Sequence, residues 1–231
     1  MSGGLSVGAG KIGGMTNTTA IAAYWDAAAP GFDDEPDHGL RDAETRAEWA
    51  RLLDGWLPPG PADVLDVGCG TGSLSRLLAE VGHRVTGVDL SPRMVERARL
   101  KLLAGGLTGR FLVGDAAAPP TGEERFGVVL CRHLMWTLPD PSAALRDWVG
   151  RLGPGGTLVL IEGRWGEAGS GGSPYAAGAG ALPWRGGVGS GELAAAVRPL
   201  VADVRIEPLS DNALLWGRPV TDERYAVIAR V

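Results

Sequence analysis

The chain has 231 residues, of which 45% are hydrophobic and 21% are charged, and its formal net charge is −5. That length suits one domain, and that composition excludes general disorder. The acidic balance argues against a protein that mainly binds nucleic acid or an anionic membrane, and no apolar run approaches the ~20 residues of a membrane span. Because the N-terminus also lacks the apolar stretch of a secretory signal, we expect a cytoplasmic protein with neither of these partners.

Cysteine and histidine are too few to indicate a metal or disulfide scaffold. The two cysteines, Cys69 and Cys131, cannot by themselves build a disulfide framework or a four-ligand zinc site. The three histidines, His38, His83 and His133, lack the short spacing of helical zinc motifs. We therefore expect no metal ion.

The N-terminal part divides into two stretches. Residues 1–18 are rich in glycine, serine and threonine without apolar periodicity, which predicts a flexible tail. Residues 19–60 are expected to be helical. The clearest helix there places four apolar side chains at positions i, i+3, i+4 and i+7, and it ends before a pair of prolines. These side chains are Trp49, Leu52, Leu53 and Trp56.

From residue 61 onward, short apolar runs alternate with helical stretches. The predicted strands are residues 64–67, 84–88, 110–113, 127–131 and 157–162. The predicted helices are residues 73–81, 92–103 and 141–152. Ser91 and Pro92 are typical N-cap and first-turn residues. Strands that alternate with helices predict an α/β domain with a parallel sheet covered on both faces, extending over residues 61–231.

A glycine-rich stretch interrupts this pattern near the C-terminus. Residues 163–191 contain 11 glycines, and neither strand nor helix periodicity survives there. The stretch predicts a loop, which is either mobile and close to a site or a disordered insertion. A helix over 191–200 and strands over 203–208 and 224–231 are expected after it.

The most informative motif is the turn after the first predicted strand. Gly68, Gly70 and Gly72 lie between that strand and a helix, so a ligand can lie against the backbone, as nucleotides do. Asp66 stands two residues before the turn, where its carboxylate would repel a pyrophosphate at the helix N-terminus. A ligand with an ammonium and a sulfonium group would be attracted instead, and S-adenosylmethionine is such a ligand.

Later residues complete a site for adenosine. Asp89 ends the second predicted strand, where a carboxylate can accept both ribose hydroxyls. Met94 is placed to lie on a flat base, and Asp115, after the third strand, could accept an adenine amino group. These three residues fit any adenosine ligand, NAD included.

Four motifs together resemble one family. The motifs are DVGCGTG at 66–72, VDLS at 88–91, GDA at 114–116 and LGPGG at 152–156. In this order and spacing, over residues 62–162, the chain resembles the class I S-adenosylmethionine-dependent methyltransferases. The resemblance implies a Rossmann-like α/β fold with a seven-stranded sheet. That sheet is mostly parallel with its last strand antiparallel, it has helices on both faces, and the cofactor is S-adenosylmethionine.

The resemblance also extends weakly to the N-terminal segment. Tyr24, Trp25 and Phe32 are similar to the aromatic lid of small-molecule members, and the spacing leaves open whether Tyr24 or Trp25 closes over the cofactor. Residues 19–60 would then form a lid segment. By resemblance, the cofactor-binding residues are Tyr24, Asp66, Gly68, Gly70, Gly72, Asp89, Leu90, Met94, Asp115, Ala116 and Cys131.

The methyl acceptor is expected to be a small molecule. The segment after the fourth predicted strand lacks the D/N-P-P-Y/F motif of DNA amino-methyltransferases and the Pro-Cys nucleophile of cytosine C5 enzymes. His133 and His38 are the candidate catalytic residues, either as a base or as an orienting group, although both could simply be packed histidines. The candidate substrate-binding residues are Trp25, Arg132, Trp136 and Trp165.

The resulting hypothesis is an S-adenosylmethionine-dependent methyltransferase that modifies oxygen or nitrogen of a small molecule. A composition typical of high-GC organisms associates it with secondary metabolism. Two alternatives stay open: an NAD-dependent oxidoreductase, and a protein that binds S-adenosylmethionine without catalysis. The sequence does not give the oligomeric state.

Overall fold

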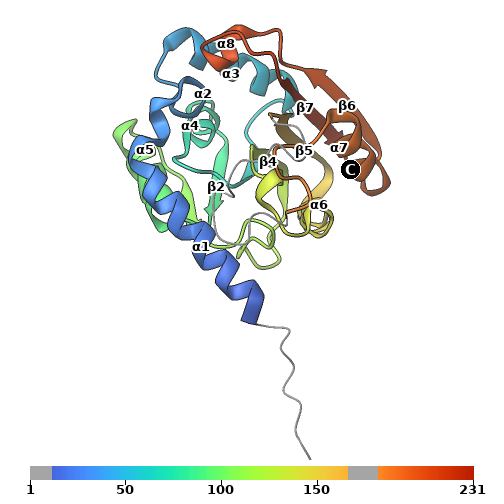
Figure 1. Ribbon diagram of the computed structural model, residues 1–231. Helices are drawn as coiled ribbons and strands as arrows, with labels where there is room; N and C mark the ends of the chain where they lie inside the picture. Colours follow the sequence, from blue (N-terminus) through green and yellow to red (C-terminus); the bar gives the residue numbers. More distant parts are fainter. Residues whose placement is uncertain (1–11, 166–181) are drawn as a thin grey trace, which may run out of the picture.

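The computed structural model describes residues 12–165 and 182–231, with side chains from residue 18 onward (Figure 1). Most of the expected tail and most of the expected glycine-rich loop lie outside these residues. The first helix begins at Ile12, inside the range expected to be a tail. Residues 163 and 164 extend a strand, although they were expected to belong to the loop.

The core is a seven-stranded sheet in the order β3-β2-β1-β4-β5-β7-β6. All neighbouring pairs from β3 to β5 are parallel, whereas β7 is antiparallel to both β5 and β6. The strands are β1 Asp63–Val67, β2 Arg84–Asp89, β3 Arg110–Val113, β4 Phe126–Arg132, β5 Leu152–Arg164, β6 Asp203–Pro208 and β7 Glu223–Arg230. The mixed sheet implied by the resemblance is confirmed.

Helices cover both faces of this sheet (Figure 1). The main helices are α1 Ile12–Ala28, α3 Ala43–Trp56, α4 Ser73–Glu80, α5 Pro92–Ala104, α6 Pro141–Gly150 and α7 Ser190–Val197. Shorter ones are η1 Ala29–Asp34, α2 Pro36–Gly39, η2 Met135–Thr137, η4 Arg198–Leu200 and α8 Ala213–Trp216. No helix among the described residues combines the length and the apolar character that crossing a membrane requires.

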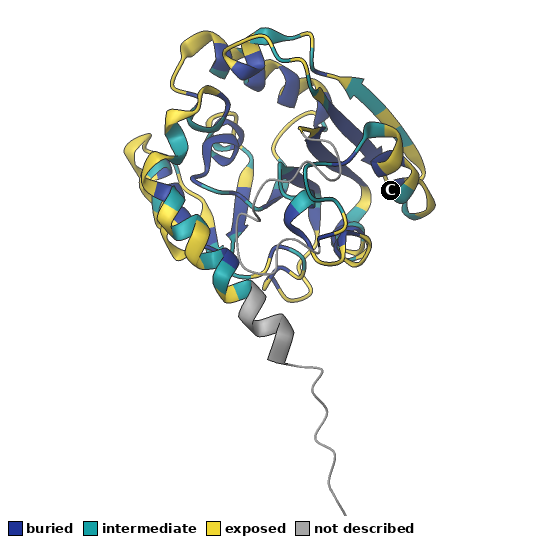
Figure 2. Ribbon diagram, viewed as in Figure 1, coloured by how far each residue is buried: buried dark blue, intermediate teal, exposed yellow. Residues whose placement is uncertain are grey.

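The alternating direction of side chains along the buried strands explains why both faces of the sheet carry a hydrophobic core. Val129 and Leu158 pack with Trp148 of α6 on one face, whereas the preceding Val128 and the following Val159 pack on the other face with α3 and α4. Successive side chains of a strand point to opposite faces of the sheet. A strand that is apolar at odd and at even positions therefore requires helices on both sides. Figure 2 shows the result as buried strands inside a shell of helices with exposed outer surfaces.

Side-chain caps begin α5 and α6, and the sequence predicted the first of them. Ser91 Oγ accepts the Met94 backbone N–H at 3.1 Å and caps α5, as expected from its place before Pro92. Asp140 caps α6 in the same manner through Ala143 N at 2.8 Å. Helix α6 ends at Gly150, two residues before its predicted end, because β5 already begins at Leu152.

The strand order reverses between β1 and β4, and this switch point positions the site. In doubly wound sheets, ligands bind outside the carboxyl ends of the strands at such a point. Here the N-terminal elements α1, η1 and α2 cross that edge, and α1 lies alongside α5 (Figure 1).

Candidate active site

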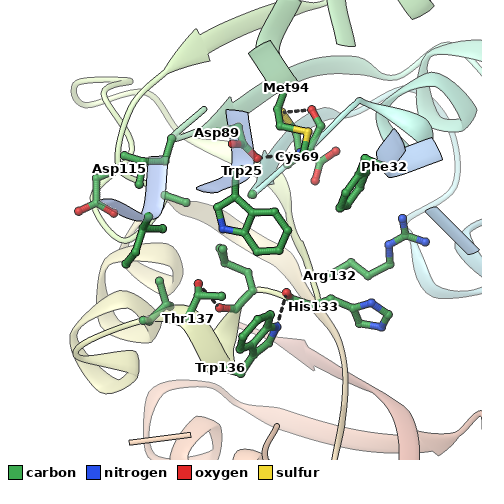
Figure 3. Close-up of a pocket in the computed structure, with 18 of the residues that line it drawn as sticks. Trp25, Phe32, Cys69, Asp89, Met94, Asp115, Arg132, His133, Trp136 and Thr137 are labelled. Atoms are coloured by element: carbon green, nitrogen blue, oxygen red, sulfur yellow. Dashed lines mark hydrogen bonds between the residues drawn. The ribbon is translucent and has the colours of Figure 1, made fainter. Parts of the chain in front are cut away.

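A cavity of about 370 Å³ lies at the carboxyl ends of β1, β2 and β4. Its walls also come from the N-terminal segment and from Trp165 after β5. Figure 3 shows the Trp25 ring in its middle, between an acidic end with Asp89 and Asp115 and a second end with Trp136 and His133. A concave site of this size with few polar groups is typical of small-molecule binding.

Most of the residues singled out in the sequence line this cavity. The cofactor candidates that do so are Asp66, Gly68, Gly70, Asp89, Leu90, Met94, Asp115 and Ala116. Both candidate histidines and all four substrate candidates also line it, namely His38, His133, Trp25, Arg132, Trp136 and Trp165.

Three cofactor candidates do not line the cavity. Tyr24 is 41% exposed, so of the two adjacent rings it is Trp25 that faces the cavity. Cys131 is fully buried in the core on β4. Gly72 is the N-cap of α4 and faces α5: a Cβ built on it would lie 2.8 Å from Cβ of Ala98, and its φ is 77°. Close helix packing and a left-handed backbone therefore both favour glycine there.

The turn after β1 has the backbone that glycine permits. Gly68 and Gly70 have φ values of 71° and 53°, a left-handed conformation that strains other residues. Gly68 N donates a hydrogen bond to the Val88 carbonyl at 2.8 Å, which ties the turn to β2. A Cβ on Gly68 would lie 2.9 Å from Leu134 Cδ2, so a larger residue would collide with the cavity wall.

Asp89 connects this turn to the start of α5. Its Oδ2 accepts Gly70 N and its Oδ1 accepts Ser91 N, each at 2.9 Å. Burial raises the pKa of Asp89, and these two hydrogen bonds oppose that rise. Each carboxylate oxygen has a further lone pair, so both can still accept a hydroxyl of a ribose.

Asp66 supplies the acidic group in the cavity wall near the glycine turn. Its Oδ2 accepts the Ser75 hydroxyl at 2.5 Å. Burial raises the pKa of Asp66 to about 6, so the carboxylate stays mostly ionised at neutral pH. A negative group in this wall suits a cationic ligand and repels a pyrophosphate.

Two acidic residues fasten the N-terminal segment over the cavity. Asp26 accepts a hydrogen bond from the Ser91 hydroxyl and another from Arg93 N at 3.1 Å, at the N-terminus of α5. Asp33 pairs with Lys101 of α5 at 2.9 Å and accepts the Thr71 hydroxyl at 2.5 Å. These contacts hold the segment to the sheet domain from both sides of the glycine turn.

Aromatic rings form much of the remaining wall. The Trp25 ring meets Phe32 and Trp136 edge-on, with centroids 6.1 and 6.4 Å apart. Phe32 stacks on His38 at 4.3 Å with an interplanar angle of 8°. Such walls fit a planar acceptor, because aromatic rings pair by stacking and edge contacts.

The two candidate histidines meet at the second end of the cavity, beside Trp136. We call it the acceptor end, because the methyl acceptor is expected to bind there. Their ring centroids lie 6.4 Å apart. Burial and the nearby Arg132 hold the pKa of His133 well below its usual range, and burial also lowers the pKa of His38. Both imidazoles are therefore neutral at pH 7, with lone pairs available.

His133 and Arg132 have unusual local arrangements. His133 has a φ of 55°, and its backbone N–H donates to Ile161 O at 2.9 Å. The Arg132 guanidinium donates to the backbone carbonyl of Asp37 at 2.6 Å and lies over the Trp49 ring. Arg132 thus braces the N-terminal segment from the cavity wall.

The sequence interpretation missed Glu162, which is fully buried on β5 behind the cavity. Its Oε1 accepts Leu134 N at 2.8 Å and Met135 N at 2.9 Å, and so positions the loop that forms one wall. Burial raises the pKa of Glu162 to about 8. A single acidic residue at the end of an otherwise apolar strand run was the available signal.

Comparison with known proteins agrees with this geometry. Residues 65–160 match the family model described as a methyltransferase domain. A "Ubiquinone biosynthesis O-methyltransferase" of Xanthomonas axonopodis pv. citri (strain 306) is 39% identical over 140 residues, which are 59% of this chain and 54% of that protein. The chain thus spans about half the length of the curated relatives it matches.

Two solved structures illustrate the likeness of fold. The N-methyltransferase NodS from Bradyrhizobium japonicum WM9, in complex with S-adenosylhomocysteine, has a TM-score of 0.64 at 19% identity and covers 90% of this chain and 98% of its own. Magnesium protoporphyrin IX methyltransferase from Synechocystis PCC 6803, with bound S-adenosylmethionine, has a TM-score of 0.63 at 18% identity and covers 93% and 96%.

Proposed function

We propose that this chain, whose residues 65–160 match a methyltransferase domain, is a class I methyltransferase that transfers the methyl group of S-adenosylmethionine to a hydroxyl oxygen of a small planar molecule. The observation that carries the proposal is one cavity with two unlike ends. Asp89 and Asp115 occupy the acidic end, with Asp66 in the wall near the glycine turn, and histidines with aromatic rings occupy the other end.

The acidic end fits S-adenosylmethionine. Asp89 offers two oxygens to the ribose, and Met94 and Leu90 offer apolar surface to the adenine. The ionised Asp66 is placed for the cationic methionine part, and the glycine turn leaves room beside it. S-adenosylmethionine supplies an electrophilic methyl group and an excellent leaving group.

The other end fits an acceptor that lies flat between aromatic rings. Methyl transfer is an in-line displacement, so much of the catalysis is alignment of acceptor and methyl carbon. The aromatic walls provide this alignment, and a neutral His133 or His38 provides a lone pair toward an acceptor hydroxyl. Oxygen as the methylated atom is supported by the similarity to the O-methyltransferase of Xanthomonas.

Three finer expectations belong to the same proposal. A cytoplasmic location is supported by Cys69 and Cys131, which are both free thiols, as is usual in reducing compartments. A role in secondary metabolism is supported by composition alone. A small-molecule acceptor, with no nucleic acid or membrane partner, is supported by the enclosed aromatic cavity and the net charge of −5.

The experiment compares ligands on the purified protein. Thermal shifts and calorimetry with S-adenosylhomocysteine and with NAD should show stabilisation by the first only. Stabilisation by NAD alone would contradict the proposal in favour of an oxidoreductase. Turnover is then assayed with matched phenols and amines. Cofactor binding without methylation of any acceptor in a broad panel would instead indicate a binding protein.

A further inference from the structure

We propose that Asp37, His38 and His133 bind a divalent transition-metal ion, such as Zn²⁺, at the acceptor end of the cavity. Asp37 and His38 are neighbours in α2, and the distant His133 converges with them because α2 lies against the loop after β4. Two imidazoles and one carboxylate are a donor set that first-row transition metals prefer.

The distances allow such an ion after a small contraction. One ligand atom from each residue lies within 4.8 Å of the other two, and His38 Nε2 is 3.8 Å from Asp37 Oδ2. A point equidistant from three atoms spaced 4.8 Å apart is about 2.8 Å from each, whereas zinc bonds to nitrogen and oxygen are ~2.1 Å long. Each ligand would therefore move inward by less than ~1 Å.

His133 supplies an independent reason to expect a ligand. Its Nε2 is buried and has no hydrogen-bond partner within the part of the chain that the structure describes. Buried polar atoms of this kind are rare, because leaving one unsatisfied is costly, and each requires an explanation. A metal ion at this position would use that lone pair, and His133 would then act on the acceptor hydroxyl through the ion rather than directly.

The surroundings of the ligands also suit a metal centre. Phe32 stacks on the His38 ring, and Trp216 stacks on the His133 ring with centroids 6.0 Å apart. These contacts fix the orientation of both imidazoles.

The ligand atoms decide which cation fits. Mg²⁺ and Ca²⁺ prefer oxygen ligands, whereas imidazole nitrogen suits zinc and related ions, so two histidines and one carboxylate favour Zn²⁺ or a similar ion. Two guanidiniums lie nearby: Arg132 hydrogen-bonds to the Asp37 carbonyl, and Arg224 pairs with Asp222 at 2.8 Å, which balances its charge.

The role of this ion rests on the proposed methyl transfer. A metal with three protein ligands keeps open positions, and it lowers the pKa of a coordinated hydroxyl. An acceptor with two adjacent oxygens could fill those positions. Its hydroxyl proton would leave to solvent before the oxygen accepts the methyl group. The substrate class is then a planar molecule with vicinal oxygen atoms.

Co²⁺ serves as the spectroscopic probe of the site. Purified protein is stripped with a chelator and titrated with Co²⁺, and Zn²⁺ then competes. We expect one equivalent, a visible absorption band typical of low coordination number, and at least tenfold weaker binding in His38→Ala, His133→Ala and Asp37→Asn. The control is His83→Ala, because His83 lies away from the cavity with its Nδ1 accepting Ala62 N at 3.1 Å.

The outcomes separate this proposal from the proposed function. Binding of S-adenosylhomocysteine is measured on every variant, both as a check of folding and as the test of the cofactor site. Wild-type protein that binds no Co²⁺, or binding equal in all four variants, would overturn the metal site while leaving the methyltransferase proposal intact. Turnover of a vicinal dihydroxy acceptor should fall after stripping and return with Zn²⁺, and unchanged turnover would overturn the role of the ion.

Discussion

Lys101 of α5 and Asp33 of η1 form an ion pair of 2.9 Å that fastens the N-terminal segment across the glycine turn. Both side chains are largely buried, with 16% and 13% of their surfaces exposed. The Lys101 ammonium also donates to Thr71 Oγ1 and to Ser73 Oγ, at 2.9 and 2.6 Å. The position of the N-terminal segment over the cavity therefore depends on a charge contact between two distant parts of the chain.

Lys101→Met should weaken binding of S-adenosylhomocysteine. The substitution leaves the Asp33 carboxylate buried beside two hydroxyls without its cation, so the segment that carries Phe32 should detach more easily. We expect roughly a tenfold higher Kd, equivalent to about 1.4 kcal/mol, by calorimetry. The matched control is Asp63→Asn, which breaks the exposed pair with Arg84 and should change Kd and stability by less than about 0.5 kcal/mol. An equal change of Kd in both variants would mean that Lys101 does not hold the N-terminal segment.

Asp89→Ala should weaken cofactor binding by about 1–3 kcal/mol, the value of charge-assisted hydrogen bonds lost to the ribose. The loss includes an indirect part, because Gly70 N and Ser91 N also lose their acceptor. Asp115→Ala is a useful comparison, since Asp115 is exposed at the same end and, among the described residues, its carboxylate accepts only Ala117 N. Unchanged affinity in Asp89→Ala would remove this residue from the ribose site.

His133→Ala should lower turnover by at least tenfold while the Kd for S-adenosylhomocysteine changes by less than twofold. The ring stands at the acceptor end, away from Asp89, so its loss affects the acceptor rather than the cofactor. His83→Ala should change neither quantity. If His133→Ala retained full turnover at saturating acceptor, the side chain would be structural only.

Glu162 should make the protein less stable as pH rises from about 4.5 to about 8. In the fold its pKa is raised to about 8 by burial, whereas the unfolded chain ionises near 4.5, so between these values the folded state holds a proton that the unfolded state has lost. The free energy of unfolding then falls with pH by at most ~1.4 kcal/mol per unit.

Glu162→Gln tests this dependence, because glutamine keeps an oxygen for Leu134 N and Met135 N but cannot ionise. Denaturant unfolding at several pH values should give a flatter profile for Glu162→Gln than for wild type. Glu162→Ala should be destabilised by about 1–3 kcal/mol at every pH, since both backbone donors lose their acceptor. Identical pH profiles for wild type and Glu162→Gln would exclude Glu162 as the titrating group.

The sequence predicted what is local and periodic. The strands from β1 to β4 were placed to within a residue or two, because each is a continuous apolar run with turn residues at its ends. The start of β5 was missed, since Gly153, Pro154 and Gly155 hid the five residues before its apolar run. Helix α8 was missed because four residues carry no periodicity.

The residues of the candidate site fall into the same two groups, those set by local sequence and those set by contacts between distant elements. The glycine turn and Asp89 were found because motif and spacing reflect a local backbone shape. Tyr24 and Trp25 could not be separated, since neighbours on a helix point ~100° apart and only the packing of α1 decides which one faces inward. The convergence of His38 with His133 and the support from Glu162 depend on contacts between distant elements, which no spacing rule contains.

The left-handed backbone of His133 carries a consequence for engineering. A residue with a side chain pays about 1 kcal/mol for that conformation, whereas glycine adopts it freely. His133→Gly would relieve that backbone cost but would also remove a ring that packs on Trp165 and Trp216. A search for heat-resistant variants would therefore measure the difference between these two effects at this position, and neither of them alone.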